Sequence, residues 1–208
     1  QERLFETGPM VYIAHEMTPF SGKDVTVFSN CDEVRLTFLK DGKTYTYNKP
    51  VVKEGMPSPV ITFPDVYDFM TDKAMSRKKK QDEVFLRAEG LIDGKVVATH
   101  EVHPARRPEK VLLWVDNENV NLKADGSDFV TVVAAIADKN GNIKRLNNYY
   151  VKFHVEGEGR ILGDAGILAN PAPVKWGTAP VLIQSTLRPG KIKITASVLF
   201  EGSQMPVS

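Results

Sequence analysis

The sequence predicts an all-β protein of two consecutive antiparallel β-sandwich domains. Three observations carry this prediction. Apolar and polar side chains alternate with a period of two along most of the chain, turn-forming dipeptides separate the alternating stretches, and a charged, proline-containing segment divides them into two sets. Because no long stretch shows the helical period of 3.6 residues, a repeated βα unit with a parallel sheet is excluded.

The alternation is clearest over residues 149–156, where Val151 and Phe153 fall on one face and Lys152 and His154 on the other. This pattern is typical of a strand buried on one side only. Further strands are predicted in the same way at residues 25–29, 34–39, 84–88, 96–102, 111–115, 130–138 and 191–199.

Turn signals lie between the predicted strands. The pairs Asp41-Gly42, Asp93-Gly94 and Asn140-Gly141 tolerate the positive φ angles of a tight hairpin turn. Residues 48–81 break the regular spacing, because they are rich in proline and charge. We interpret them as a long excursion with a short strand near residues 60–63 and one helical turn near residues 66–74.

A domain boundary is predicted in residues 103–109, where two prolines and a charge cluster separate the two sets of strands. The length of 208 residues suits two domains of about 100 residues each. We therefore predict domains at residues 1–106 and 107–208. The second holds about seven strands in about 100 residues, which is the size of an immunoglobulin-like sandwich.

The charge balance argues against a nucleic-acid partner. The chain has 27 basic and 26 acidic side chains, without the one-sided basic surface that phosphate backbones require. The basic run at residues 77–80 is interpreted as a solvated loop. No membrane span is expected, because the longest apolar stretch, residues 129–137, is far shorter than the ~20 residues that cross a bilayer.

The start of the chain and its single cysteine give little information about the function. The start at Gln1 shows no signal peptide, and we expect such a chain to be a piece of something longer. The single Cys31 excludes an internal disulfide and cannot by itself build a structural zinc site.

The histidines predict no metal centre. His100 and His103 are three residues apart on or just past a strand, so their side chains point to opposite faces. His154 falls on the polar face of its strand and His15 at a strand end, and both are expected to be solvated.

The acidic residues predict neither a calcium site nor a catalytic pair. Residues 138–142 resemble the start of a calcium loop, but the glycine comes too early and the twelfth position is Tyr149 instead of a bidentate glutamate. Glu156 and Glu158 are each followed by glycine, so nothing in the sequence holds them in a fixed geometry. The glycine-rich stretches at 157–160 and 163–166 do not open helices and therefore offer no phosphate site. We predict no catalytic, cofactor-binding or metal-binding residues and no cofactor.

Aromatic side chains are the remaining candidates for ligand contact, since a flat ring can stack on a sugar. Those considered are Trp114, Trp176, Tyr45, Tyr47, Tyr149 and Tyr150. Trp114 is expected to face the domain interface. Trp176, in a proline-rich loop, and the strand with Tyr45 and Tyr47 are the candidate ligand-binding residues.

Two motifs in the first half resemble a known family. Residues 25–36 (VTVFSNCDEVRL) resemble the SN-x-D-x-V-x-L strand pair of the small β-sandwich that follows the catalytic barrel in glycoside hydrolase family 2 β-galactosidases. Residues 86–102 (LRAEGLIDGKVVATHEV) are similar to the closing hairpin of that domain.

The second half resembles the C-terminal immunoglobulin-like domain of the same family, of the kind related to invasin and intimin repeats. The residues that carry this likeness are 122–128, 137–141, 151–159 and 189–196. The chain departs from the family pattern at residues 163–170, in place of an Asn-Gly-Asp type loop, at residues 38–42, and in the length of the 48–81 excursion.

The resemblance implies a function without catalysis. The family's catalytic glutamates sit on a (β/α)₈ barrel, and no residue of this chain matches their motifs. The expected role is that of a C-terminal accessory region that stabilises or shapes a glycan-hydrolysing parent enzyme. The catalytic barrel is then the partner, and the location is extracytoplasmic, either periplasmic or secreted.

Two alternatives remain. One sandwich is a carbohydrate-binding module, with Trp176, Tyr45 and Tyr47 as stacking platforms. Otherwise the chain is a cell-adhesion spacer, a hypothesis that the lack of any mutual repeat between the two halves argues against.

Overall fold

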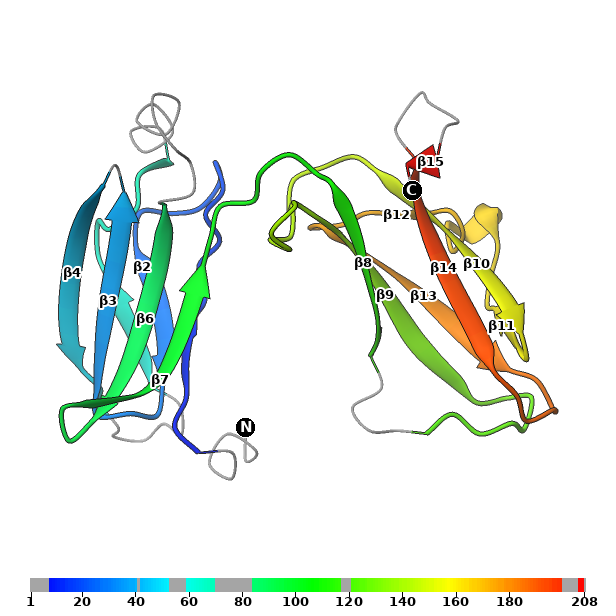
Figure 1. The fold of residues 1–208 in the computed structure, drawn as a ribbon, viewed down its shortest axis with the longest axis horizontal. Helices are drawn as coiled ribbons and strands as arrows, with labels where there is room; N and C mark the ends of the chain where they lie inside the picture. The colour runs from blue at the N-terminus through cyan, green and yellow to red at the C-terminus, as the bar shows by residue number, and fades with distance from the viewer. Residues whose placement is uncertain are drawn as a thin grey trace. The chain divides into compact units, whose positions relative to one another are not determined.

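The computed structural model describes residues 8–40, 42–52, 59–69, 84–116, 121–199 and 206–207. The chain divides into two compact units, Gln1–Pro104 and Ala105–Ser208, each with a hydrophobic core of its own. All strand pairs in the described parts are antiparallel, so the predicted all-β fold of antiparallel sandwiches is confirmed (Figure 1). The boundary placed after residue 106 stays a prediction.

Unit 1 is a sandwich of two sheets, with strand orders β1-β2-β5 and β4-β3-β6-β7. Its strands are β1 (Val11–Ile13), β2 (Val25–Ser29), β3 (Glu33–Lys40), β4 (Lys43–Pro50), β5 (Val60–Phe63), β6 (Phe85–Ile92) and β7 (Lys95–Val102). Its core forms because alternate residues of each strand face the other sheet. Val25 and Val27 on β2 meet Leu36 and Phe38 on β3 in one buried cluster.

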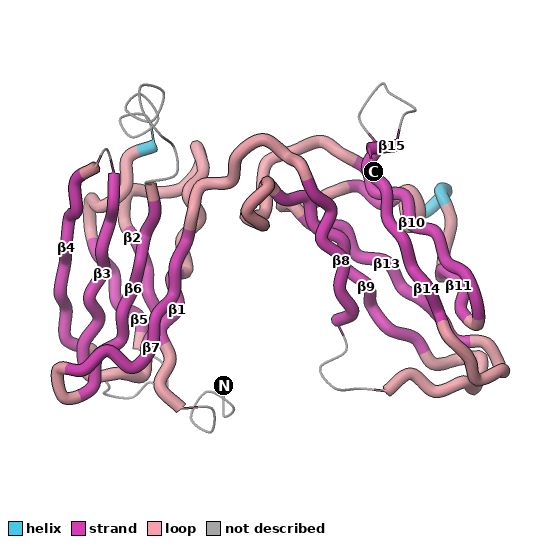
Figure 2. Tube along the Cα trace, viewed as in Figure 1, coloured by secondary structure: helices cyan, strands magenta, loops and turns pink. Residues whose placement is uncertain are grey.

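Unit 2 is also a sandwich of two sheets, with strand orders β12-β10-β14-β15 and β11-β13-β9-β8 (Figure 2). Its strands are β8 (Lys110–Asp116), β9 (Phe129–Ala137), β10 (Tyr150–Gly157), β11 (Gly159–Ile161), β12 (Ala172–Pro173), β13 (Thr178–Ser185), β14 (Ile192–Leu199) and β15 (Pro206–Val207). A single 3₁₀ turn, Ala165–Ile167, follows β11. The core joins Phe153 of β10 to Ile136 of β9 and Val181 of β13.

Each strand predicted from alternation is present, with ends that differ by at most a few residues. Strand β4 was expected only as the strand with Tyr45 and Tyr47. The strands that were not predicted are β1, β11, β12, β13 and β15. In β13 the inward residues Ala179, Val181 and Ile183 alternate with Pro180 and Leu182, which are not polar, so the period of two is hidden. Of the helical turn expected near residues 66–74, the part from residue 70 onward lies outside the described residues, as does the basic run at 77–80.

Two of the three predicted turns connect paired strands. Asp93 and Gly94 have φ angles of 50° and 73° and close the β6–β7 hairpin between Ile92 and Lys95. Gly42, with a φ of 69°, lies between Lys40 and Lys43 at the β3–β4 turn. Gly141 follows β9, where Ala137 bridges to Ile143.

The Ser29-Asn30 pair of the first family-like motif has a structural task. The Ser29 hydroxyl donates to the Met10 carbonyl at 2.8 Å, while the Asn30 side chain accepts from the Met10 amide at 2.6 Å. The Asn30 amide also donates to the Gly8 carbonyl at 2.9 Å. These bonds replace ladder contacts before the start of β1 and hold the N-terminal segment against the end of β2.

Gly90 allows the closest approach in unit 1. A Cβ atom on Gly90 would lie 2.5 Å from the Cys31 sulfur, and the β6–β7 register shifts directly after this residue. Cys31 is completely buried. The absence of a side chain at residue 90 therefore makes room for the corner between β2 and β3.

Gly90→Ala is expected to destabilise unit 1 by about 1–3 kcal/mol, because the added methyl group overpacks a closed site. Adding Cys31→Ala removes the clashing sulfur, so the double variant should lose less stability than the sum of the two single variants. The measurement is urea unfolding followed by far-UV circular dichroism. Gly22→Ala is the matched control, since nothing lies within 4 Å of a Cβ built at Gly22. If the stability losses of Gly90→Ala and Cys31→Ala simply add in the double variant, the two residues are not in the close contact described above.

Candidate functional site

The titratable residues make no metal cluster in the described parts of the chain. No three His, Cys, Asp or Glu side chains among these residues lie where they would hold one ion. The same residues contain no helix that is both long and apolar enough to cross a bilayer.

His100 links the two sheets of unit 1. Its Nδ1 accepts a hydrogen bond from the Ile13 amide at 3.2 Å, and its ring packs against Tyr12 with the centroids 4.7 Å apart. Nδ1 has to be unprotonated to accept this bond. Burial lowers the pKa of His100, which favours the neutral form. His103 contacts other neighbours, the Phe85 ring and the Glu101 carboxylate.

The expectation for the other two histidines holds for only one of them. His154 lies on the outer face of β10 with 70% of its side chain exposed, as predicted. His15 is not solvated: its ring is half-buried and meets Tyr67 edge-on at 5.0 Å. Burial lowers the pKa of His15, although a hydrogen bond with the Asp24 backbone and the nearby Glu16 act in the opposite direction.

Asp138 is a buried carboxylate that organises a turn. One oxygen accepts from the Asn140 and Asn142 amides at 2.9 and 3.0 Å. The other accepts from the Arg106 amide at 3.0 Å and from the Asn142 side chain at 3.1 Å. Burial would raise the pKa of Asp138, but these four bonds outweigh it and hold the pKa below its usual range. In residues 138–142 the Asp138 carboxylate thus binds N–H groups of the protein itself.

Glu156 and Glu158 do not form a pair. Glu156, on the outer face of β10, approaches the Lys193 ammonium at 3.3 Å. Glu158 accepts a 2.6 Å hydrogen bond from the Thr186 hydroxyl. Each carboxylate has a different partner, so the arrangement lacks the shared, rigid site of an acid–base couple.

The two tyrosines of β4 do not form an open platform. Tyr47 packs against the core of unit 1, edge-on to Phe63 at a centroid distance of 6.4 Å. Tyr45 is 40% exposed, and the Lys40 ammonium lies 5.3 Å from its ring centroid. Since Tyr47 is engaged in the core, Tyr45 is the more accessible ring of the two.

Trp176 lies at the tip of a tight hairpin in unit 2. Lys175 and Thr178 exchange both backbone hydrogen bonds, at 2.8 and 3.1 Å, with Trp176 and Gly177 between them. Both tip residues have positive φ angles, 50° and 85°, a conformation that a bulky residue rarely adopts. The indole is 50% exposed. A solvent-exposed Trp held in a strained backbone conformation is a candidate for ligand contact.

The hairpin tip is fixed to the segment that precedes β10. A Cβ atom on Gly177 would lie 2.6 Å from the Ile143 side chain and 2.9 Å from the Lys144 carbonyl. The Arg145 guanidinium also donates to the Trp176 carbonyl at 3.4 Å. Only glycine fits at residue 177, so the position of Trp176 is determined by the packing of its neighbour.

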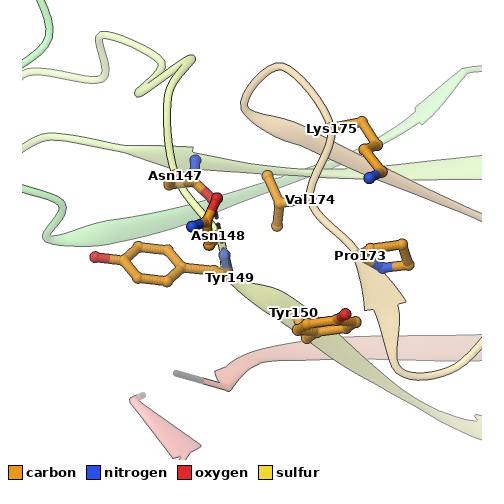
Figure 3. A pocket seen from close by; sticks show the side chains of 7 residues that line it. All are labelled: Asn147, Asn148, Tyr149, Tyr150, Pro173, Val174 and Lys175. Atoms are coloured by element: carbon orange, nitrogen blue, oxygen red, sulfur yellow. Dashed lines mark hydrogen bonds between the residues drawn. The ribbon is translucent and has the colours of Figure 1, made fainter. Parts of the chain in front are cut away.

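A shallow pocket of about 190 Å³ lies beside this hairpin (Figure 3). One wall is the start of β10 and the residues before it, and the other is β12 with the two residues after it. Its lining residues are Asn147, Asn148, Tyr149, Tyr150, Pro173, Val174 and Lys175. Of the aromatic candidates, Tyr149 and Tyr150 line it. Asn148 and Lys175 were not predicted, because polar loop residues carry no periodic signal.

The comparisons with known proteins point to one family. Residues 113–199 match the C-terminal domain 5 of glycoside hydrolase family 2. The chain is 32% identical to a β-galactosidase of Thermoanaerobacter pseudethanolicus, over 97% of this chain and 26% of that protein. A β-galactosidase of Bacteroides ovatus is 35% identical over 115 residues, which are 50% of this chain and 13% of that one.

A solved structure extends the likeness to both units. The β-glycosidase from Bacteroides vulgatus is 26% identical, with a TM-score of 0.63 over 91% of this chain and 23% of that one. The chain thus spans about a quarter of the length of this protein and of the Thermoanaerobacter relative.

The His100 bond predicts that unit 1 is weakened by mild acid. The unfolded histidine titrates near pH ~6.5 and the folded one lower, so the unfolded state binds more protons as the pH falls. The stabilisation, about 1 kcal/mol for the hydrogen bond, is therefore full above pH ~6.5 and lost below it. Hydrogen exchange of the Ile13 amide measured across this range should report the loss. Two variants test the cause of this pH dependence. His100→Asn keeps an acceptor that does not titrate, so it should reduce the pH dependence, whereas His154→Asn should not. An Ile13 amide that exchanges equally at all these pH values, after correction for intrinsic rates, would contradict a role of His100 in the pH dependence.

Asp138→Ala is expected to destabilise unit 2 by about 2–4 kcal/mol, since it leaves buried donors without an acceptor. The lowered pKa of Asp138 adds stability that is present above the unfolded value of about 3.9 and is lost as the pH falls through the folded pKa. Asp138→Asn should remove this acid sensitivity. Both tryptophans, Trp114 and Trp176, lie in unit 2, so tryptophan fluorescence during urea unfolding reports this unit. The exposed Asp116→Asn is the control, and equal effects of the two Asn substitutions would disprove the role of Asp138.

Proposed function

From the premise that this chain carries C-terminal domains of a glycoside hydrolase family 2 enzyme, we propose that it is a non-catalytic accessory region. In this role it stabilises or shapes the enzyme to which it belongs, and its partner is the catalytic barrel of that enzyme. An extracytoplasmic location, periplasmic or secreted, is part of the proposal and rests on the resemblance to the family.

One observation carries the non-catalytic role. The acidic side chains that the sequence offers as a calcium site or a catalytic pair make structural contacts within the protein instead. Asp138 accepts four hydrogen bonds inside unit 2, while Glu156 and Glu158 have separate partners. A retaining glycosidase needs two carboxyl groups about 5–5.5 Å apart on a rigid frame. These three residues do not supply such a frame.

The fraction of the relative's length that this chain covers supports the same role. The chain corresponds to about a quarter of the Thermoanaerobacter β-galactosidase, and most of that quarter is accounted for here by two sandwiches, each with its own core. A domain that folds around its own core can be added to an enzyme without supplying any reacting group.

A second candidate function is carbohydrate binding. Specific observations favour it: the half-exposed Trp176 in a left-handed backbone conformation and the pocket beside its hairpin. Tyr45 and Tyr47 contribute less support, since Tyr47 packs in the core. No contact in the described residues favours the cell-adhesion hypothesis over these two.

The 208-residue chain alone is expected not to hydrolyse a chromogenic β-galactoside above the rate of a heat-treated sample. Release of the chromophore is followed by absorbance, with the Thermoanaerobacter relative as the positive control. Hydrolysis that the heat treatment abolishes would overturn the proposed role. The variants Glu156→Gln and Glu158→Gln would then show whether either carboxylate is responsible.

A further inference from the structure

The pocket in unit 2 is preformed by backbone pairing. Tyr150 pairs with Pro173 in the β10–β12 register, and the Val174 amide donates to the Tyr149 carbonyl at 2.9 Å. Val174 is buried, and Tyr149 packs against the core. The two walls are therefore held together by the sandwich itself, and a ligand would not have to order them.

Tyr150 presents an aromatic surface to this pocket. It alternates with the buried Val151, so its ring lies on the outer face of the sheet, where it is 37% exposed. Its neighbours in the register are Pro173 on one side and Leu199 on the other. These apolar neighbours limit the positions that the ring can adopt.

Three polar groups around the pocket are available to a ligand. In the described part of the chain, the Asn148 amide, the Tyr150 hydroxyl and the Lys175 ammonium have no hydrogen-bond or ion-pair partner. Figure 3 shows them around the same hollow, with Pro173 and Val174 between them.

The neighbouring Asn147 behaves differently. Its side chain donates to the Lys144 carbonyl at 2.7 Å and accepts from the Tyr149 amide at 3.2 Å, so it holds the turn that precedes β10. Of the two consecutive asparagines, one is used for structure and the other is free to bind.

The composition of the pocket selects the ligand class. A pyranose ring has an apolar face of C–H groups and a rim of hydroxyls, which suits an aromatic surface bordered by an amide and an ammonium group. The lining includes no carboxylate, so it offers no site for a cation. The volume of about 190 Å³ is below the ~300–1,000 Å³ of pockets for drug-sized molecules, which limits the occupant to a single ring.

We propose that this pocket binds one pyranose ring of a glycan, with Tyr150 as the stacking surface and Asn148 and Lys175 as hydroxyl partners. The inference deepens the carbohydrate-binding candidate by giving it a site that the sequence motifs do not indicate. It is independent of the proposed lack of catalysis.

The test is a titration of the ¹⁵N-labelled 208-residue chain with methyl β-D-galactopyranoside, followed by amide chemical shifts. Binding in the millimolar range is expected for one shallow ring site. The shifted amides should be those of residues 147–150 and 174–176. Saturable shifts at these positions support the site, and unchanged spectra up to the solubility limit of the sugar overturn it.

Variants separate this site from other sugar contacts. Tyr150→Ala should weaken binding about tenfold, since it removes the ring, and Asn148→Ala should weaken it about threefold without touching the core. Tyr12→Ala is the matched control, because it removes an exposed tyrosine in the other unit that is not a candidate for ligand contact. Binding that survives Tyr150→Ala and is lost in Trp176→Ala overturns this pocket while leaving carbohydrate binding as a function of the chain.

Discussion

Burial of one face of each sheet against its partner sheet is the constraint on which both units depend. Antiparallel strands alternate their side chains, so a sheet with one apolar face has to cover it. In unit 1 this covering joins Phe63 of β5 to Phe38 of β3, and in unit 2 it joins Phe153 of β10 to Ile183 of β13. Since each unit completes its own core, each has the anatomy of an independent domain.

Polar and titratable side chains stabilise this packing by hydrogen bonds to the backbone. Asp138 holds the turn after β9, His100 connects β1 with β7, and Asn30 holds the segment before β1. Asp138 and Asn30 lie where a ladder of backbone hydrogen bonds ends, and His100 accepts from a backbone amide of the edge strand β1, so each satisfies a donor without a strand partner. The occupation of these groups by the protein's own backbone agrees with the proposed accessory role.

The pocket proposed to bind a sugar is formed by segments next to two paired strands. The residues before β10 and those after β12 are distant in the sequence, and strand pairing brings them to opposite walls of one pocket. The hairpin with Trp176 is fixed by Gly177 against the same pre-β10 segment. Sandwich domains commonly carry binding residues in this way, because the sheets supply precision while the loops supply chemistry.

The sequence by itself determined the all-β class, most of the strands and the hairpin turns, because these depend on the local period of two and on residues such as Gly94 that tolerate a positive φ. It also indicated the family, through short motifs in both halves, and the comparisons point to the same family. Only the tertiary structure decided that Tyr47 packs in a core, that His15 is half-buried and that His100 accepts a backbone bond, since each depends on a partner from another element. The same reason applies to the pocket: Asn148 and Lys175 have no pattern in the sequence, and they meet only because β10 pairs with β12.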